Sequence, residues 1–97
     1  MSYFLAPEAE AELVDAASFC AKQFSASVAE NFVATFELKV RLIADFPGVG
    51  TATSKGRRLF LIGRYAFSIL YRVEDGAVRI GAIAHHRRWP GYWQQRK

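Results

Sequence analysis

Apolar positions follow a helical period through the first half of the chain. After a short apolar segment at residues 2–5, which predicts a strand, apolar side chains recur every three or four positions over residues 7–24. Pro7 suits the first helical position, because the N–H that it lacks has no partner there. Residues 27–46 carry a second and clearer apolar stripe, formed by Val28, Phe32, Phe36, Val40 and Ile43.

Local signals predict where the second helix begins and ends. Ser27 followed by Glu30 matches a capping box, in which the two side chains satisfy N–H groups of the first turn. Pro47 restricts the residue before it to extended conformations, so the helix ends near Phe46. The joint between the two helices is short, which predicts an antiparallel hairpin. Neither helix is apolar all round, so both must pack on the second half of the chain.

The second half of the chain has the pattern of strands and turns. Residues 47–56 are rich in Gly, Pro, Ser and Thr and predict a loop. Gly63-Arg64 is predicted as a two-residue turn, and Asp75-Gly76 is the strongest hairpin signal. Apolar runs around these turns predict three strands, at residues 59–62, 67–73 and 77–84. The order β-α-α-β-β-β predicts an α+β fold with the helical hairpin packed on one face of a small, mostly antiparallel sheet.

The Asp75-Gly76 turn sets the register of the last two strands. It pairs Arg72 with Arg79 and Ile69 with Ala82, and alternate residues share a face. The face toward the helices then holds Phe67, Ile69, Tyr71, Val73, Val78, Ile80 and Ala82. The opposite face holds Ser68, Leu70, Arg72, Arg79, Gly81 and Ile83. Two opposed arginines repel each other by roughly a few tenths of a kcal/mol. Either both guanidiniums point into water, or an anionic and partly apolar partner covers this face.

Length and composition limit the class of protein. A chain of 97 residues predicts a single domain over residues 1–97, and 52% apolar residues exclude a disordered segment. Cys20 is the only cysteine, so no disulfide can form within the chain, and its place on an apolar helix face predicts a packed thiol. No apolar run reaches the ~20 residues of a membrane span. We therefore expect a cytoplasmic protein without a membrane segment.

The formal net charge of +4 is divided unevenly along the chain. Residues 1–46 carry seven acidic and three basic side chains, whereas residues 47–97 carry ten basic and two acidic ones. Eight of those ten are arginines, which bind carboxylates and phosphates through paired donors. The distribution indicates an anionic partner for the C-terminal half.

The last strand leads into a basic and aromatic tail. His85 and His86 are neighbours on a strand and point to opposite faces, so they cannot hold one metal ion, and we predict neither a metal site nor a cofactor. The tail residues of interest are Arg87, Arg88, Trp89, Tyr92 and Trp93. They could dock nucleic acid through phosphate contacts and stacking. Alternatively, the aromatic rings complete the core while the arginines stay in water.

Several short segments occur in a characteristic order. They are Pro47-Gly48-Val49-Gly50, Gly56-Arg57-Arg58-Leu59, Tyr71-Arg72-Val73, Ile83-Ala84-His85-His86-Arg87-Arg88 and Pro90-Gly91-Tyr92-Trp93. Together with the element order, they resemble the RelE/ParE toxin superfamily over essentially the whole chain, and most closely its ParE branch in bacterial type II toxin–antitoxin systems. The resemblance implies a toxin neutralised by a ParD-like antitoxin in a hetero-oligomer. It also implies a target, which is DNA gyrase for ParE-like members and ribosome-bound mRNA for RelE-like ones.

The resemblance leaves an enzyme inhibitor and a ribonuclease as alternatives. RelE-like ribonucleases place basic residues where this chain has Leu59, Leu61 and Ser68. Apolar side chains neither transfer protons nor offset phosphate charge, so we favour a toxin that inhibits gyrase by binding and uses no catalytic residue. In the ribonuclease alternative, the catalytic residues are His86 with Arg58 or Arg88.

The two predicted surfaces follow from this interpretation. The acidic and apolar tail of the antitoxin is expected to bind Leu59, Leu61, Leu70, Arg72 and Arg79. The surface directed at the target is expected to comprise Arg87, Arg88, Trp89, Tyr92 and Trp93, with direct nucleic-acid binding as a secondary possibility.

Overall fold

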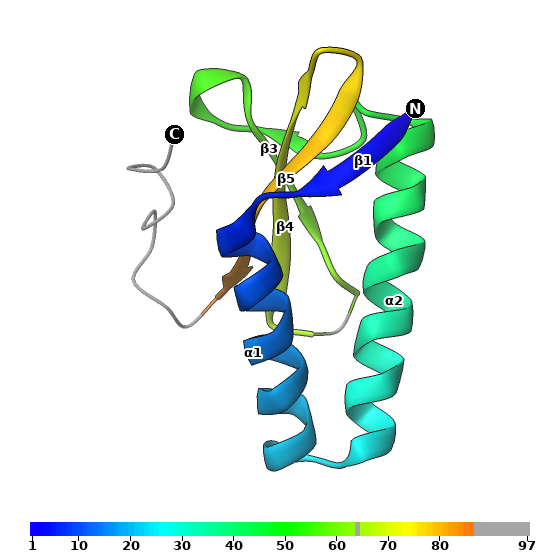
Figure 1. The fold of residues 1–97 in the computed structure, drawn as a ribbon, viewed down its shortest axis with the longest axis vertical. Helices are drawn as coiled ribbons and strands as arrows, with labels where there is room; N and C mark the ends of the chain where they lie inside the picture. Colours follow the sequence, from blue (N-terminus) through cyan, green and yellow to red (C-terminus); the bar gives the residue numbers. More distant parts are fainter. Residues whose placement is uncertain (64, 87–97) are drawn as a thin grey trace.

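A computed structural model describes residues 1–63 and 65–86 of the chain (Figure 1). Its elements are β1 (Ser2–Leu5), α1 (Pro7–Gln23), α2 (Ala26–Asp45), β2 (Thr51–Ala52), a 3₁₀ turn (Ser54–Gly56), β3 (Arg58–Leu61), β4 (Phe67–Glu74) and β5 (Ala77–His85). The predicted α+β class, the helical hairpin and the three C-terminal strands are confirmed. The prediction of a loop throughout residues 47–56 was wrong, because Thr51 pairs with Leu59 and Ala52 with Arg58 of β3.

The strands form one sheet in the order β1-β5-β4-β3-β2. β1 runs parallel to β5, from Ser2 opposite Ala77 to Leu5 opposite Ile80, and the other neighbours are antiparallel. A parallel pair needs a long crossover, and the helical hairpin supplies it between the first strand and the rest. Figure 1 shows α1 and α2 side by side on the same face of the sheet. The other face, called the open face below, is the one that the helices leave uncovered.

The core lies between the helical hairpin and the sheet. The predicted stripe of α2 is confirmed, since Phe32, Phe36, Val40 and Ile43 are all buried. α1 contributes small buried residues, which let its backbone approach the sheet closely: Ala9, Ala16 and Cys20. From the sheet, the core receives Ile69, Tyr71, Val78, Ile80 and Ile83. Within the described residues, no helix is long and apolar enough to cross a membrane.

The ends of the helices follow the prediction except at the start of α2. α1 begins at Pro7, and α2 ends at Asp45, just before Pro47. The capping box at Ser27 was wrong. The N-cap is Ser25, whose extended backbone lets its hydroxyl accept a hydrogen bond from the N–H of Val28 at 3.1 Å. Because the helix begins at Ala26, Ser27 lies inside the first turn and cannot be the N-cap.

The last hairpin contains a bulge that changes the predicted faces. Asp75 and Gly76 both have positive φ, at 51° and 76°, and Arg72 pairs with Arg79 as predicted. The register shifts between Leu70 and Tyr71, which pair with Ala82 and Ile80 and leave Gly81 as the extra residue. The predicted pairing of Ile69 with Ala82 was therefore wrong. Ile69 lies opposite Ile83, so Ile83 faces the helices and Ala82 lies on the open face.

The connection between β3 and β4 is also longer than predicted. The N–H of Tyr65 donates to the carbonyl oxygen of Ile62 at 3.1 Å, as the predicted two-residue turn requires, but the N–H of Ile62 donates to the carbonyl oxygen of Phe67 at 3.0 Å, so the strand pairing resumes two residues further along. Tyr65 instead packs edge-on against Phe32, and its hydroxyl donates to Asn31 at 2.6 Å. Because Tyr65 packs on α2, it does not continue the ladder, and β4 begins only at Phe67.

Candidate functional site

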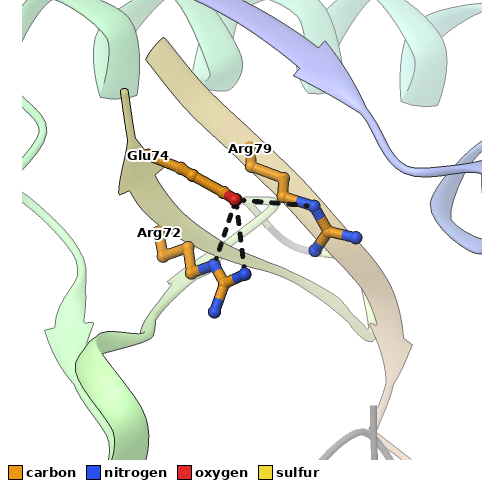
Figure 2. A network of polar contacts seen from close by, with 3 residues as sticks. All are labelled: Arg72, Glu74 and Arg79. Carbon is orange, nitrogen blue, oxygen red and sulfur yellow. Dashed lines mark hydrogen bonds and ion pairs between the residues drawn. The ribbon is translucent and has the colours of Figure 1, made fainter. Parts of the chain in front are cut away.

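The open face is crossed by two opposed arginines and a carboxylate between them. Arg72 of β4 lies directly opposite Arg79 of β5, with 34% and 24% of their side chains exposed. One oxygen of Glu74, Oε2, lies 3.3 Å from both Nε and Nη2 of Arg72 and 3.7 Å from Nε of Arg79 (Figure 2). The two guanidiniums therefore share one internal carboxylate. We had considered only water or an external partner for these arginines, and the role of Glu74 was missed.

A cavity of about 210 Å³ lies beside these arginines. Its lining comprises Glu8, Arg57, Leu70, Tyr71, Arg72, Arg79 and Gly81. Arg57 is only 6% exposed, which is unusual for a charged residue. It follows the turn at Ser54–Gly56, where Lys55 and Gly56 both have positive φ and reverse the chain into β3. Sequence reasoning included Arg57 in a motif but gave it no role. The glycine at position 56, which permits the chain reversal just before Arg57, was the sequence signal that could have indicated its position.

The charges around the cavity favour an anion. Three guanidiniums, those of Arg57, Arg72 and Arg79, are accompanied by two carboxylates, those of Glu8 and Glu74. Among the described side chains around the cavity, positive charges therefore exceed negative charges by one.

The three leucines predicted to bind the antitoxin lie at different distances from the arginine pair. Leu59 lies opposite Leu70 on neighbouring strands, and both belong to the open face next to the arginine pair. Leu70 is 3% exposed, so it forms part of the cavity floor, whereas Leu61 is 58% exposed and lies further along β3, opposite Ser68. The structure thus gathers Leu59, Leu70 and the two arginines, with Leu61 at the periphery.

The structure does not bring together the two described residues of the ribonuclease alternative. Arg58 lies opposite Tyr71 on the face toward the helices, and its Nη1 donates to the carbonyl oxygens of Gly50 at 2.7 Å and Gly48 at 3.3 Å. His86 lies near the other end of the strands, where its Nε2 is 2.8 Å from Oγ of Ser68. Arg58 lies three residue steps along β3, roughly 10 Å, from Leu61, the partner of Ser68.

The rest of the predicted tail surface lies outside the described residues. This holds for Arg88 of the ribonuclease alternative and for the target-directed set of Arg87, Arg88, Trp89, Tyr92 and Trp93. The two histidines before it have different surroundings, although β5 ends at His85 and only that histidine lies on the strand. The His85 ring makes edge contacts with Phe19 and Phe67, whereas His86 contacts Ser68. In residues 1–63 and 65–86, no three His, Cys, Asp or Glu side chains gather to hold a metal ion.

The predicted packed thiol is confirmed. Cys20 is buried on the inner face of α1, and burial raises the pKa of its thiol above the ordinary value of 9.0. A thiol that stays protonated is a poor nucleophile, so Cys20 serves packing.

Comparison with known proteins defines the class of this fold. It is similar to a solved structure described as "Chromosomal ParDE TA system from P. aeruginosa", with a TM-score of 0.76 and 22% sequence identity over 88% of this chain and 95% of that one. That likeness shows a shared fold. Residues 3–90 match the family model described as "ParE toxin of type II toxin-antitoxin system, parDE", so the chain belongs to the ParE toxin family. The resemblance to the ParE branch is thereby confirmed. A search of curated protein sequences gives no match.

Proposed function

We propose that this ParE-family toxin is held inactive by a ParD-like antitoxin that covers the open face. The family description names a parDE system, and the similar solved structure is described as a ParDE system. The observation that carries the proposal is the opposed pair of Arg72 and Arg79 beside a cavity with excess positive charge. An acidic and apolar segment of the antitoxin would meet complementary groups there, in a hetero-oligomer.

The binding groups on the open face are Leu59, Leu61, Leu70, Arg72 and Arg79. Guanidinium groups form paired hydrogen bonds with carboxylates, and these bonds are stronger than those between neutral groups. The exposed Leu61 and half-buried Leu59 offer apolar contact on the same face. Opposite charges fix the orientation of the bound segment, while apolar contact adds area that leaves water.

The toxin is proposed to act in the cytoplasm by binding DNA gyrase and not by cutting RNA. Acid–base cleavage of RNA needs two groups that reach the same phosphate. Arg58 is engaged by the Gly48 and Gly50 carbonyls on the helix-facing side, whereas His86 contacts Ser68 on the open face. These placements weigh against His86 and Arg58 as a catalytic pair, while Arg88 lies outside the described residues. The tail residues Arg87, Arg88, Trp89, Tyr92 and Trp93 remain the proposed target-directed surface.

One pair of assays tests this proposal. The purified chain is added to gyrase with relaxed plasmid, and separately to translating ribosomes whose mRNA is mapped for cuts. We expect supercoiling to stop and the mRNA to stay intact, and we expect His86→Ala to inhibit gyrase as strongly as the unaltered chain. Cut mRNA that becomes intact with His86→Ala, together with normal supercoiling, would establish the ribonuclease instead.

A further inference from the structure

We propose that the cavity beside Arg72 and Arg79 is a subsite for a single carboxylate side chain of the protein partner, and that Glu74 holds the same two guanidiniums until that carboxylate enters. This inference rests on the proposed function, since it names the group that an antitoxin would place on the open face. It concerns the cavity lined by Arg57, Arg72, Arg79, Leu70 and Gly81.

The charge balance favours one carboxylate. Glu74 offers one oxygen to both arginines, at 3.3 Å from Arg72 and 3.7 Å from Arg79. These contacts are long for charge-assisted hydrogen bonds, and Glu74 is 41% exposed, so water screens them. Counted over the described side chains, the guanidiniums of Arg57, Arg72 and Arg79 and the carboxylates of Glu8 and Glu74 leave one positive charge in excess. A second carboxylate would bring the group to neutrality.

The arginines have donors left for a ligand. Each guanidinium carries five N–H donors, and Glu74 approaches Nε and Nη2 of Arg72 but only Nε of Arg79. In Figure 2 the terminal nitrogens of Arg79 point away from Glu74. A Cβ placed on Gly81 would lie 3.5 Å from Nη1 of Arg79, so this nitrogen lies above the glycine that lines the cavity.

The size of the cavity favours a side chain over a nucleic acid. Its volume of about 210 Å³ is below the roughly 300–1,000 Å³ of pockets that hold small-molecule ligands. A phosphodiester carries a sugar on each side, and both sugars would have to stay outside a space of this size. The end of an Asp or Glu side chain can enter, and its methylene groups would contact Leu70 while Gly81 leaves the space open.

The test uses two peptides and the arginine side-chain signals in NMR spectra. The probes are acetyl-Ala-Leu-Glu-Leu-Ala-amide and the same peptide with Gln at its centre, titrated while the Nε–H signals of Arg57, Arg72 and Arg79 are followed. We expect the Glu peptide to shift these signals and to bind at least about tenfold more tightly than the Gln peptide, which corresponds to ~1.4 kcal/mol. Equal affinities for the two peptides would overturn the proposal, and so would inorganic phosphate that displaces the Glu peptide at equal concentration.

Variants locate the binding in the cavity. Gly81→Val fills the space without changing charge and should abolish the preference for Glu over Gln. Arg79→Gln should do the same without altering the bulge, which keeps the test decisive if Gly81→Val does not fold. Glu74→Gln should raise the affinity for the Glu peptide several-fold, because it removes a competing carboxylate. Arg41→Gln, an equal charge change on exposed α2, should leave the preference unchanged. An unaltered preference in Arg79→Gln would contradict the cavity as the site.

Failure of this inference can be told apart from failure of the proposed function. If the purified cognate antitoxin loses affinity for the Arg72→Glu, Arg79→Glu double variant but the two peptides bind equally, the open face binds the antitoxin without a carboxylate subsite. If the Glu peptide is preferred but the antitoxin binds the double variant normally, the cavity takes a carboxylate that the antitoxin does not supply.

Discussion

The hydroxyl of Tyr71 accepts a hydrogen bond from the backbone N–H of Gly50 at 2.9 Å and donates one to the carbonyl oxygen of Pro47 at 2.7 Å. Tyr71 is 1% exposed and stands in β4 between Leu70 and Arg72 of the open face. One buried side chain therefore ties the loop after α2 to the strand that carries part of the proposed antitoxin surface. The position of that surface depends on a contact made on the opposite face of the sheet.

Tyr71→Phe should lower the free energy of unfolding by about 1–3 kcal/mol, because it leaves the buried N–H of Gly50 and the part-buried carbonyl of Pro47 without their partner. Urea denaturation measures this loss. Tyr65→Phe is the matched control, since its hydroxyl makes an exposed hydrogen bond to Asn31 and its loss should cost roughly half a kcal/mol or less. Equal losses in the two variants would show that the Tyr71 hydroxyl does not stabilise the loop.

The close approach of Gly50 to Tyr71 gives a second prediction. A Cβ on Gly50 would lie 2.8 Å from the Tyr71 hydroxyl and 2.9 Å from the carbonyl oxygen of Leu59, whereas a Cβ on Gly48 meets nothing within 4 Å. Gly50→Ala should therefore destabilise the fold by about 1–3 kcal/mol, and Gly48→Ala should change stability by less than about 0.5 kcal/mol. Thermal unfolding of both variants is the measurement, and similar melting temperatures would refute the steric explanation.

The sequence pattern predicted most of the fold because its strongest signals are local. The stripe from Phe32 to Ile43 and the Asp75-Gly76 turn each define an element without reference to the rest of the chain. The bulge at Gly81 could not be predicted in this way. Its register depends on how β5 packs against the helices, and glycine is compatible with a regular strand as well as with a bulge.

The site was predicted only in part for a similar reason. Hairpin register placed Arg72 opposite Arg79, since both lie within a few residues of a strong turn signal. Arg57 enters the cavity only through the reversal of the chain at Lys55 and Gly56, and the sharing of Glu74 depends on side-chain geometry. Neither feature leaves a periodic trace in the sequence.

The N-terminus of α2 offers a test of the corrected cap. Ser25→Ala should cost ~1 kcal/mol, because the N–H of Val28 loses its acceptor. Ser27→Ala should be nearly neutral, since Ser27 lies inside the first turn and Ser25 is the cap. Chemical denaturation of the two variants under identical conditions checks the difference. A larger loss of stability for Ser27→Ala than for Ser25→Ala would show that Ser27 is the cap after all.

The buried thiol of Cys20 predicts a dependence of stability on pH. Burial raises the pKa of Cys20, so the folded state keeps the proton that the unfolded state loses near pH 9.0. The resulting stabilisation is complete below that pH and is lost as the pH rises toward the folded-state pKa. The stability difference between the unaltered chain and Cys20→Ala should therefore shrink above pH 9.0, measured by urea denaturation across the alkaline range. A constant difference would show that the thiol ionises equally in both states.

Calorimetry with the purified cognate antitoxin tests the central claim most directly. Arg72→Glu combined with Arg79→Glu should weaken binding by about 2–5 kcal/mol, since two attractive charges become repulsive. The control is Lys22→Glu combined with Arg41→Glu, the same charge change on exposed positions of α1 and α2, which should bind nearly as the unaltered chain does. If both double variants bind with the affinity of the unaltered chain, the open face is not where the antitoxin is held.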